Sequence, residues 1–283
     1  MSQHVALTFD VDALSLWIGS FGHTSPGVVS RGEFDVVGTQ RVLDLLAEHS
    51  ILATFFVPGH TAHAFPAVVE AITAGGHEIG HHGYVHERVG ALDRGAERAI
   101  LEAGFTALDA VAGVRPVGYR SPSWDFTEST VELLEEFGFT YDSSLMASDF
   151  VPYHPRRGDG IYSDRPYAFG VPSPLLELPV SWVLDDFPYF EYVRGVTPGL
   201  RNPDDVLAIW SGEFDEFVAA REAGCFTVTM HPQVIGRRPR LTILRRLIER
   251  IAASPEVRFA TLREVAEVWR AREAVAVDGA AGA

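Results

Sequence analysis

The chain has 283 residues, of which 47% are hydrophobic and 22% are charged, and this composition excludes wholesale disorder. Its 23 Lys and Arg residues stand against 38 Asp and Glu residues, so the formal net charge is −15. An acidic protein repels the phosphate backbone, which argues against nucleic acid as a partner. No apolar run has the length of a membrane-spanning helix, so we expect no membrane partner either.

In the first half of the chain, short apolar runs alternate with segments of helical periodicity. The runs predict strands at residues 5–9, 51–57 and 77–80. The periodic segments predict helices at residues 40–49, 66–73 and 92–111, and a further helix that Thr127 caps and Gly138 ends.

The same alternation resumes toward the C-terminus. It predicts helices at residues 204–223, 241–253 and 262–272, and strands at residues 226–230 and 257–260. Repeated strand–helix units indicate parallel strands covered by helices, and a chain of this length favours a distorted (β/α) barrel over an open sheet. We therefore expect one α/β domain over residues 1–272, followed by a flexible tail at residues 273–283.

The region of about 145–203 breaks the alternation. Nine of the 17 prolines lie between Phe150 and Pro203, together with many aromatic residues. Prolines at this density exclude long helices and central strands. We interpret the region as an irregular insertion that packs over one end of the barrel, where such loops shape substrate pockets. A structural cover without ligand contacts is the alternative.

Two short patterns carry side chains that suit metal chemistry. Asp10 and Asp12 follow the first strand and lie on the same side of it, and paired carboxylates beside a metal can act as one ligand and one proton acceptor. His82 and His86, four residues apart, can reach one metal ion from a helical turn. Each pattern alone is a weak signal, because solvated carboxylates and histidine pairs are common.

Four short motifs follow one another along the chain. They are LTFDVD at residues 7–12, EIGHHGYVH at 78–86, YRSP at 119–122 and TMH at 229–231. In these motifs the sequence resembles the polysaccharide deacetylase family, the NodB-homology carbohydrate esterases, and the resemblance covers roughly residues 5–265. The family fold is a distorted (β/α) barrel, in agreement with the strand–helix alternation.

The resemblance implies a metal-dependent hydrolase of amide C–N bonds other than peptide bonds. Its metal ligands would be Asp12, His82 and His86, with zinc as the foremost metal and cobalt, nickel, iron or manganese as alternatives. Asp10 would be the base that deprotonates water, and Arg120 would orient this carboxylate. Three protein ligands leave positions open for water and for a substrate carbonyl.

The resemblance also implies an acid, and aromatic residues are candidates for the substrate pocket. His231 would protonate the leaving nitrogen, and Asp142 is the candidate carboxylate that supports this histidine. Trp124, Trp182 and Tyr84 are predicted to contact the substrate, with core packing as an equal alternative for the two tryptophans.

Departures from the family pattern bear on the substrate. Gly83 stands where the family usually has Ser or Thr, and His81 stands where it has Asn. Residues 177–182, followed by Asp185 and Asp186, look like a subgroup of intracellular hydrolases of cyclic amides or imides that includes allantoinase-like members. Two substrate classes therefore stay open: N-acetyl groups on a saccharide, and cyclic imides or ureides.

The start of the chain bears on location. The first strand is predicted almost at the N-terminus, and no signal peptide precedes it, which predicts a cytoplasmic protein that acts on a small molecule or a soluble saccharide. Two other classes compete with the hydrolase. The presence of Asp10 and His231 disfavours an inactive carbohydrate-binding homologue, and the wide sequence spacing of the ligands disfavours a non-haem iron oxygenase. A homo-oligomer whose neighbouring subunit completes the site is left open.

Overall fold

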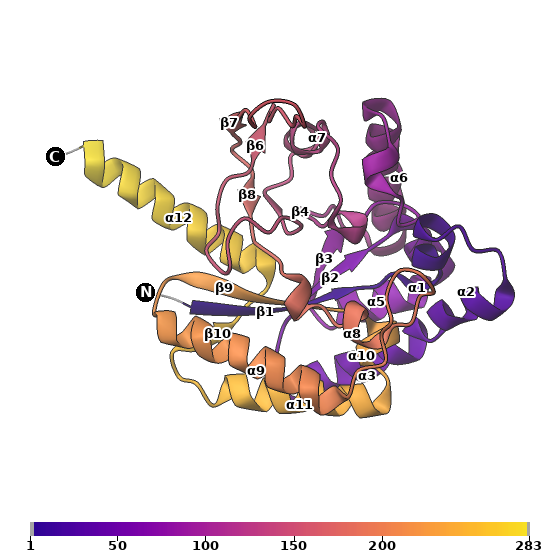
Figure 1. The fold of residues 1–283 in the computed structure, drawn as a ribbon. Helices are drawn as coiled ribbons and strands as arrows, with labels where there is room; N and C mark the ends of the chain where they lie inside the picture. The colour runs from indigo at the N-terminus through magenta and orange to yellow at the C-terminus, as the bar shows by residue number, and fades with distance from the viewer. Residues whose placement is uncertain (1–2, 282–283) are drawn as a thin grey trace.

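The computed structural model of the protein describes residues 3–281. A sheet of eight parallel strands curls into half a barrel with helices around it (Figure 1), which confirms the predicted distorted (β/α) barrel. From one end of the sheet the strands are β9 (Gly224–Met230), β1 (Gln3–Asp10), β2 (Thr54–Val57), β3 (Glu78–His81), β4 (Gly118–Tyr119), β5 (Tyr141–Asp142) and β8 (Leu176–Glu177). β10 (Val257–Phe259) pairs with the start of β1 on the same edge as β2.

β1 is the strand with the most partners in the half-barrel, because it pairs with β9, β10 and β2. It pairs with β9 from Gln3 to Phe9, whereas its other edge is shared by β10 at its start and β2 at its end. A parallel bridge between Asp185 and Thr229 attaches the segment after β8 to β9. Residues that follow β8 are thereby brought to the same end of the sheet as residues that follow β1 and β9.

The alternation of side chains along β1 determines which residues face the barrel interior. The odd-numbered residues from Val5 to Phe9 belong to the main hydrophobic core between the sheet and the helices. Ala6 belongs to the smaller core on the inner face. Asp10, which has the same parity as Ala6, therefore points toward the interior at the C-terminal end of the strand.

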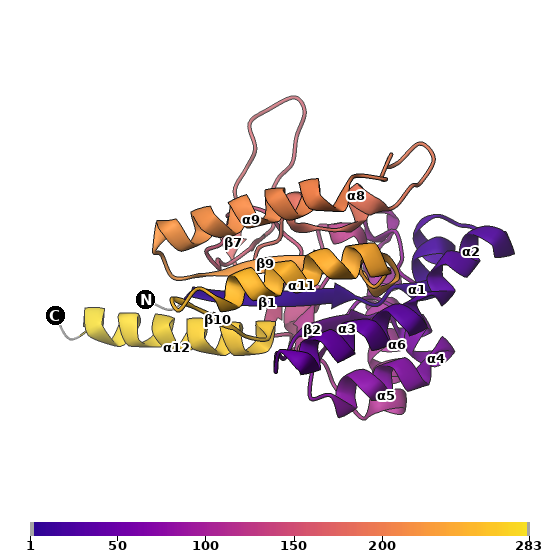
Figure 2. The same ribbon diagram turned by 90° about the horizontal axis from the view of Figure 1, so that it is seen from below.

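Helices cover the outside of the sheet. They include α3 (Asp35–Glu48), α4 (Gly59–Ala64), α5 (Pro66–Ala74), α6 (Arg94–Ala112), α7 (Thr130–Phe137), α9 (Pro203–Ala220), α10 (Pro232–Ile235) and α11 (Arg238–Ala252). α2 (Pro26–Glu33) instead lies beyond the C-terminal end of β1, next to α10 (Figure 2). Figure 2 shows α9 and α11 side by side along β1 and β9. The predicted long helices are confirmed with shifted ends. Gly138 ends α7 as predicted, with φ of 78°, but the helix begins only at Thr130 and not beside Thr127.

The region of about 145–203 departs from its prediction in one respect. It is largely irregular, with short elements at β6 (Arg156–Arg157), β7 (Val171–Pro172), η4 (Trp182–Leu184) and α8 (Phe187–Phe190). Within it, however, β8 pairs with β5 as a strand of the main sheet, so the region is not one continuous insertion. A strand of two residues is too short to show periodicity, although Leu176 and Leu178 around it are fully buried.

The C-terminal helix is longer than predicted. α12 (Leu262–Ala281) continues through the segment expected to be a flexible tail, and Glu273 accepts a hydrogen bond from the Trp269 indole at 3.1 Å. Residues 282 and 283 lie outside the described residues. No helix in the described part of the chain is long and apolar enough to cross a membrane.

Candidate active site

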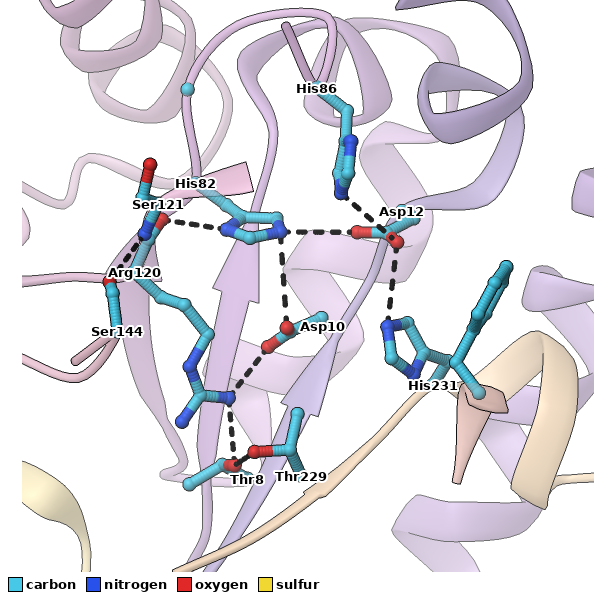
Figure 3. A network of polar contacts seen from close by, with 12 residues as sticks. Thr8, Asp10, Asp12, His82, His86, Arg120, Ser121, Ser144, Thr229 and His231 are labelled. Carbon is cyan, nitrogen blue, oxygen red and sulfur yellow. Dashed lines mark hydrogen bonds and ion pairs between the residues drawn. The ribbon is translucent and has the colours of Figure 1, made fainter. Parts of the chain in front are cut away.

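Five side chains that can carry chemistry come from the C-terminal ends of four strands of the sheet (Figure 3). Asp10 ends β1 and Asp12 follows it, His82 follows β3, Arg120 follows β4, and His231 follows β9. The C-terminal ends of parallel strands meet at one edge, which is where barrel enzymes place their active sites. The fold thus gathers the separate sequence motifs into one cluster.

Asp12, His82 and His86 form the innermost group of the cluster, and all three are buried. Asp12 Oδ1 lies 3.4 Å from His82 Nε2, and Asp12 Oδ2 lies 3.4 Å from His86 Nε2. Among the described residues, neither Asp12 oxygen nor His82 Nε2 has a hydrogen-bond partner. Burial favours a raised pKa for Asp12, but the facing imidazoles lower this pKa below its usual range. Buried, unpartnered atoms arranged in this way form a candidate site for a cation.

Hydrogen bonds at the outer ring nitrogens orient both imidazoles. His82 Nδ1 lies 2.7 Å from the Arg120 carbonyl, which can only accept, so this nitrogen carries a hydrogen. The Ser20 hydroxyl donates to the His86 carbonyl at 2.9 Å, and His86 Nδ1 in turn donates to Ser20 Oγ at 2.6 Å. Each Nε2 is then the nitrogen directed at Asp12. One carboxylate and two imidazoles oriented in this way fit a divalent metal of the zinc type.

Arg120 fixes the carboxylate of Asp10. Its guanidinium is fully buried, and Nη1 donates to Asp10 Oδ1 and to Thr8 Oγ1, each at 2.8 Å. On the other side Nε donates to the Ser143 carbonyl at 2.9 Å and Nη2 to Ser143 Oγ at 3.0 Å. The arginine therefore neutralises a buried carboxylate and holds its orientation, so that Asp10 Oδ2 lies 3.9 Å from His82 Nε2.

His231 approaches Asp12 from β9 and is held by Asp186. Its Nδ1 lies 2.7 Å from Asp186 Oδ1, and its backbone N–H also donates to the Asp186 carboxylate. Its Nε2 lies 3.6 Å from Asp12 Oδ2. Burial favours a lower pKa for His231, but the carboxylates of Asp185 and Asp186 raise this pKa well above its usual range. A histidine that stays protonated near neutral pH can act as a general acid.

The carboxylate that contacts His231 is Asp186, and not Asp142 as the sequence predicted. Asp142 accepts a hydrogen bond from Ser144 Oγ at 2.8 Å and belongs to a buried pair with Glu177. Burial raises the pKa of Asp142 to about 6. Burial and the neighbouring Asp142 carboxylate raise the pKa of Glu177 well above its usual range. This pair supports the ends of β5 and β8 behind the cluster.

Asp185, Asp186 and His231 form a second group with metal-ligating atoms close together. Asp185 Oδ1 accepts the backbone N–H of Phe187 at 2.7 Å, and burial raises the pKa of Asp185 to about 7. His231 already donates to Asp186. The hydrogen between His231 Nδ1 and the Asp186 carboxylate therefore holds these side chains together, and no second metal is needed to explain the group.

The cluster opens into a cleft of about 680 Å³. Its lining includes Asp10, Asp12, His86 and His231 at the polar end and Trp124, Trp182, Phe187 and Tyr189 on the walls. The rings of Trp124 and Trp182 lie 4.1 Å apart between centroids. Ser123 and Trp124 both have positive φ, 55° and 56°, which is a strained conformation for residues with a side chain. Tyr84, also predicted to contact substrate, does not line the cleft, and its ring instead packs near His60.

Comparisons with known proteins place the chain in a family. A profile of the family described as polysaccharide deacetylase matches residues 2–141. A peptidoglycan deacetylase of Helicobacter pylori is 36% identical over 277 residues, which cover 93% of this chain and 94% of the relative. A peptidoglycan deacetylase-like protein of Gibberella zeae is 29% identical, over 93% of this chain and 85% of the relative.

Solved structures agree with this placement. A crystal structure from Mycobacterium smegmatis, assigned to the polysaccharide deacetylases, has a TM-score of 0.85 at 39% identity and covers 96% of this chain and 91% of its own. The fold is shared with an allantoinase structure, with a TM-score of 0.78 at 24% identity over 95% of this chain and 90% of that one. This chain therefore belongs to the polysaccharide deacetylase family, hydrolases of carbon–nitrogen bonds other than peptide bonds.

Proposed function

We propose that the chain is a metal-dependent N-deacetylase that hydrolyses the acetamido group of a saccharide of the peptidoglycan type. The observation that carries the proposal is the position of Asp12, His82 and His86 between an arginine-bound carboxylate and a protonated histidine, at the polar end of one cleft. The Helicobacter pylori relative, a peptidoglycan deacetylase matched over 94% of its length, supports this substrate class.

Asp12, His82 and His86 would hold the metal, with zinc as the foremost ion. When bound, a divalent metal polarises the amide carbonyl and lowers the pKa of water. The unpartnered atoms of Asp12 and His82 support this ligand set. The Arg120 carbonyl and the Ser20 hydroxyl keep both rings in the orientation that ligation needs.

Asp10 accepts the proton of the attacking water. Its Oδ1 is bound by Arg120, which leaves Oδ2 free on the side of the ligand group. As the water oxygen adds to the carbonyl carbon, its proton moves to this carboxylate. Because Ser143 and Thr8 fix the guanidinium, the base cannot turn away from the water.

His231 donates the proton that the leaving nitrogen needs. An amine leaves readily only when it is protonated as the C–N bond breaks, and the products are then acetate and a free amine. Asp186 holds the ring by Nδ1, which leaves Nε2–H to face the reacting group.

Trp124 and Trp182 supply the walls on which we propose that the substrate packs. Their paired rings form an apolar surface beside the polar end of the cleft, and the cleft volume lies within the ordinary range for small-molecule sites. The cytoplasmic location and a homo-oligomer stay predictions.

The test measures acetate released from N-acetylglucosamine oligomers and peptidoglycan fragments, beside ring opening of cyclic imides, before and after chelation. The proposal predicts acetate release that a chelator abolishes and that added Zn²⁺ restores. Ring opening without acetate release would assign the chain to the cyclic-amide class instead. Acetate release that chelation leaves unchanged would contradict the role of the metal.

A further inference from the structure

The loop that follows α8 brings one cationic side chain to the cleft. Arg201 lies directly before the N-cap of α9 and is the single Arg or Lys among the described residues that line the cleft. Its backbone N–H donates to the Tyr189 carbonyl at 2.9 Å, which fixes the base of this loop to a wall of the cleft. The loop, orange in Figures 1 and 2, extends from the end of α8.

The Arg201 side chain is exposed at the cleft, and within residues 3–281 its guanidinium makes no hydrogen bond or ion pair. Two arginines on the nearby α11 are paired by contrast: Arg246 with Asp204 and Arg250 with Asp215. In a chain with 38 acidic residues, a guanidinium left unpaired at a cleft is available to a ligand.

Among the described residues that line the cleft, Arg201 is the one cation besides the proposed metal position and His231. Asp10 and Asp185 line the same cleft with carboxylates. An anionic group on a substrate is therefore repelled by the carboxylates of the lining and, outside the catalytic cluster, is attracted only to Arg201 among the described lining residues. A guanidinium binds a carboxylate with two parallel N–H···O bonds.

We propose that Arg201 binds a carboxylate of the substrate, and that the preferred substrates are N-acetylated saccharides that carry such a group. This inference rests on the proposed deacetylase function and narrows its substrate class. Arg201 determines specificity and takes no part in bond cleavage, so its removal affects binding of the anionic substrate and leaves the chemical step intact.

The test compares an N-acetylmuramic acid-containing fragment with the same fragment after its carboxylate has been converted to an amide. Arg201→Gln is expected to raise KM for the carboxylate form about tenfold, with little change in kcat and none for the amidated form. Arg201→Lys is expected to restore part of the loss. Arg194→Gln is the matched control, because Arg194 is an exposed arginine of the same loop that does not line the cleft.

An equal rise in KM for both fragments, or no change for either, would overturn the role of Arg201 while the deacetylase function stands. If neither fragment is hydrolysed, calorimetric binding of both fragments to Asp10→Asn tests the Arg201 site separately from the deacetylase function. If Asp10→Asn binds the carboxylate fragment more tightly than the amidated one, and if adding Arg201→Gln removes this difference, the site is supported even without turnover. Equal binding of both forms would overturn it.

Discussion

The ring of His231 depends on Asp186 for both its orientation and its charge. Asp186→Asn is expected to lower kcat about 100-fold, which is within the range that a general acid contributes. It should also move the alkaline limb of the pH–rate profile to lower pH, because His231 loses one of the two carboxylates, Asp185 and Asp186, that raise its pKa. Asp142→Asn, at another buried aspartate, is expected to leave that limb in place. Equal shifts in the two variants would refute the assignment of Asp186.

Asp142 and Glu177 make the stability of the protein depend on pH. Burial raises the pKa of Asp142 to about 6 and that of Glu177 well above its usual range, whereas carboxyl groups of the unfolded chain titrate near pH 4. Between these values the folded state binds more protons than the unfolded state. The free energy of unfolding therefore falls as the pH rises above about 4.

Glu177→Gln tests this account, because its amide oxygen can still accept the backbone N–H of Ser144. The free energy of unfolding is measured with urea for the variant and the wild-type chain at about pH 5 and about pH 8. Relative to the wild-type value, the variant's free energy of unfolding is expected to be higher at about pH 8 than at about pH 5 by about 1–2 kcal/mol. Glu128→Gln, at an exposed position, should show no such pH dependence. A stability difference for Glu177→Gln that is the same at both pH values would contradict the account.

At the scale of elements, the loop between β3 and His86 explains a departure from the family pattern. Gly83 has φ of +69°, and a Cβ there would lie 2.7 Å from Glu87 Oε2. Glu87 accepts hydrogen bonds from the backbone N–H groups of Tyr84 at 3.0 Å and Val85 at 2.7 Å, and so it organises the turn between His82 and His86. Glycine therefore stands where the family has a hydroxyl because both the backbone and the carboxylate exclude a side chain.

Gly83→Ser is accordingly expected to lower both the free energy of unfolding, by about 1–3 kcal/mol, and the affinity for Zn²⁺. Gly22→Ser is the matched control, since Gly22 has φ of +63° and a Cβ there would have no atom within 4 Å. It carries the backbone strain without the clash. Zinc affinity measured by competition with a chelating dye should fall only in Gly83→Ser, and an equal fall in both would contradict the role given to Glu87.

Elements with clear periodicity could be predicted from the sequence, and the shortest ones could not. β1 and β9 are continuous apolar runs, and this pattern places the residues that follow them, Asp12 and His231, at strand ends. β4, β5 and β8 have two residues each, so no periodicity marks them. Their positions depend on pairing with strands elsewhere in the chain, which local sequence does not encode.

At the scale of the whole molecule, the site depends on contacts between distant segments. Asp186 contacts His231 although the two residues are 45 positions apart in the sequence. Asp186 lies in the proline-rich region, where no local sequence pattern predicts the path of the backbone. The acidic pair at residues 185 and 186 is visible in the sequence, but its partner is not. Conversely, Tyr84 lies within a motif and still points away from the cleft, because the turn after β3 directs its ring to α4.

We propose that Asp12 holds a metal and that Asp10 acts as a base beside it. The most direct measurement is the zinc content of purified Asp12→Ala and Asp10→Asn together with their release of acetate. The account predicts that Asp12→Ala loses both metal and turnover, whereas Asp10→Asn keeps about one metal per chain and loses turnover by about 100-fold or more. An Asp12→Ala protein with wild-type metal content, or an Asp10→Asn protein with wild-type turnover, would contradict it.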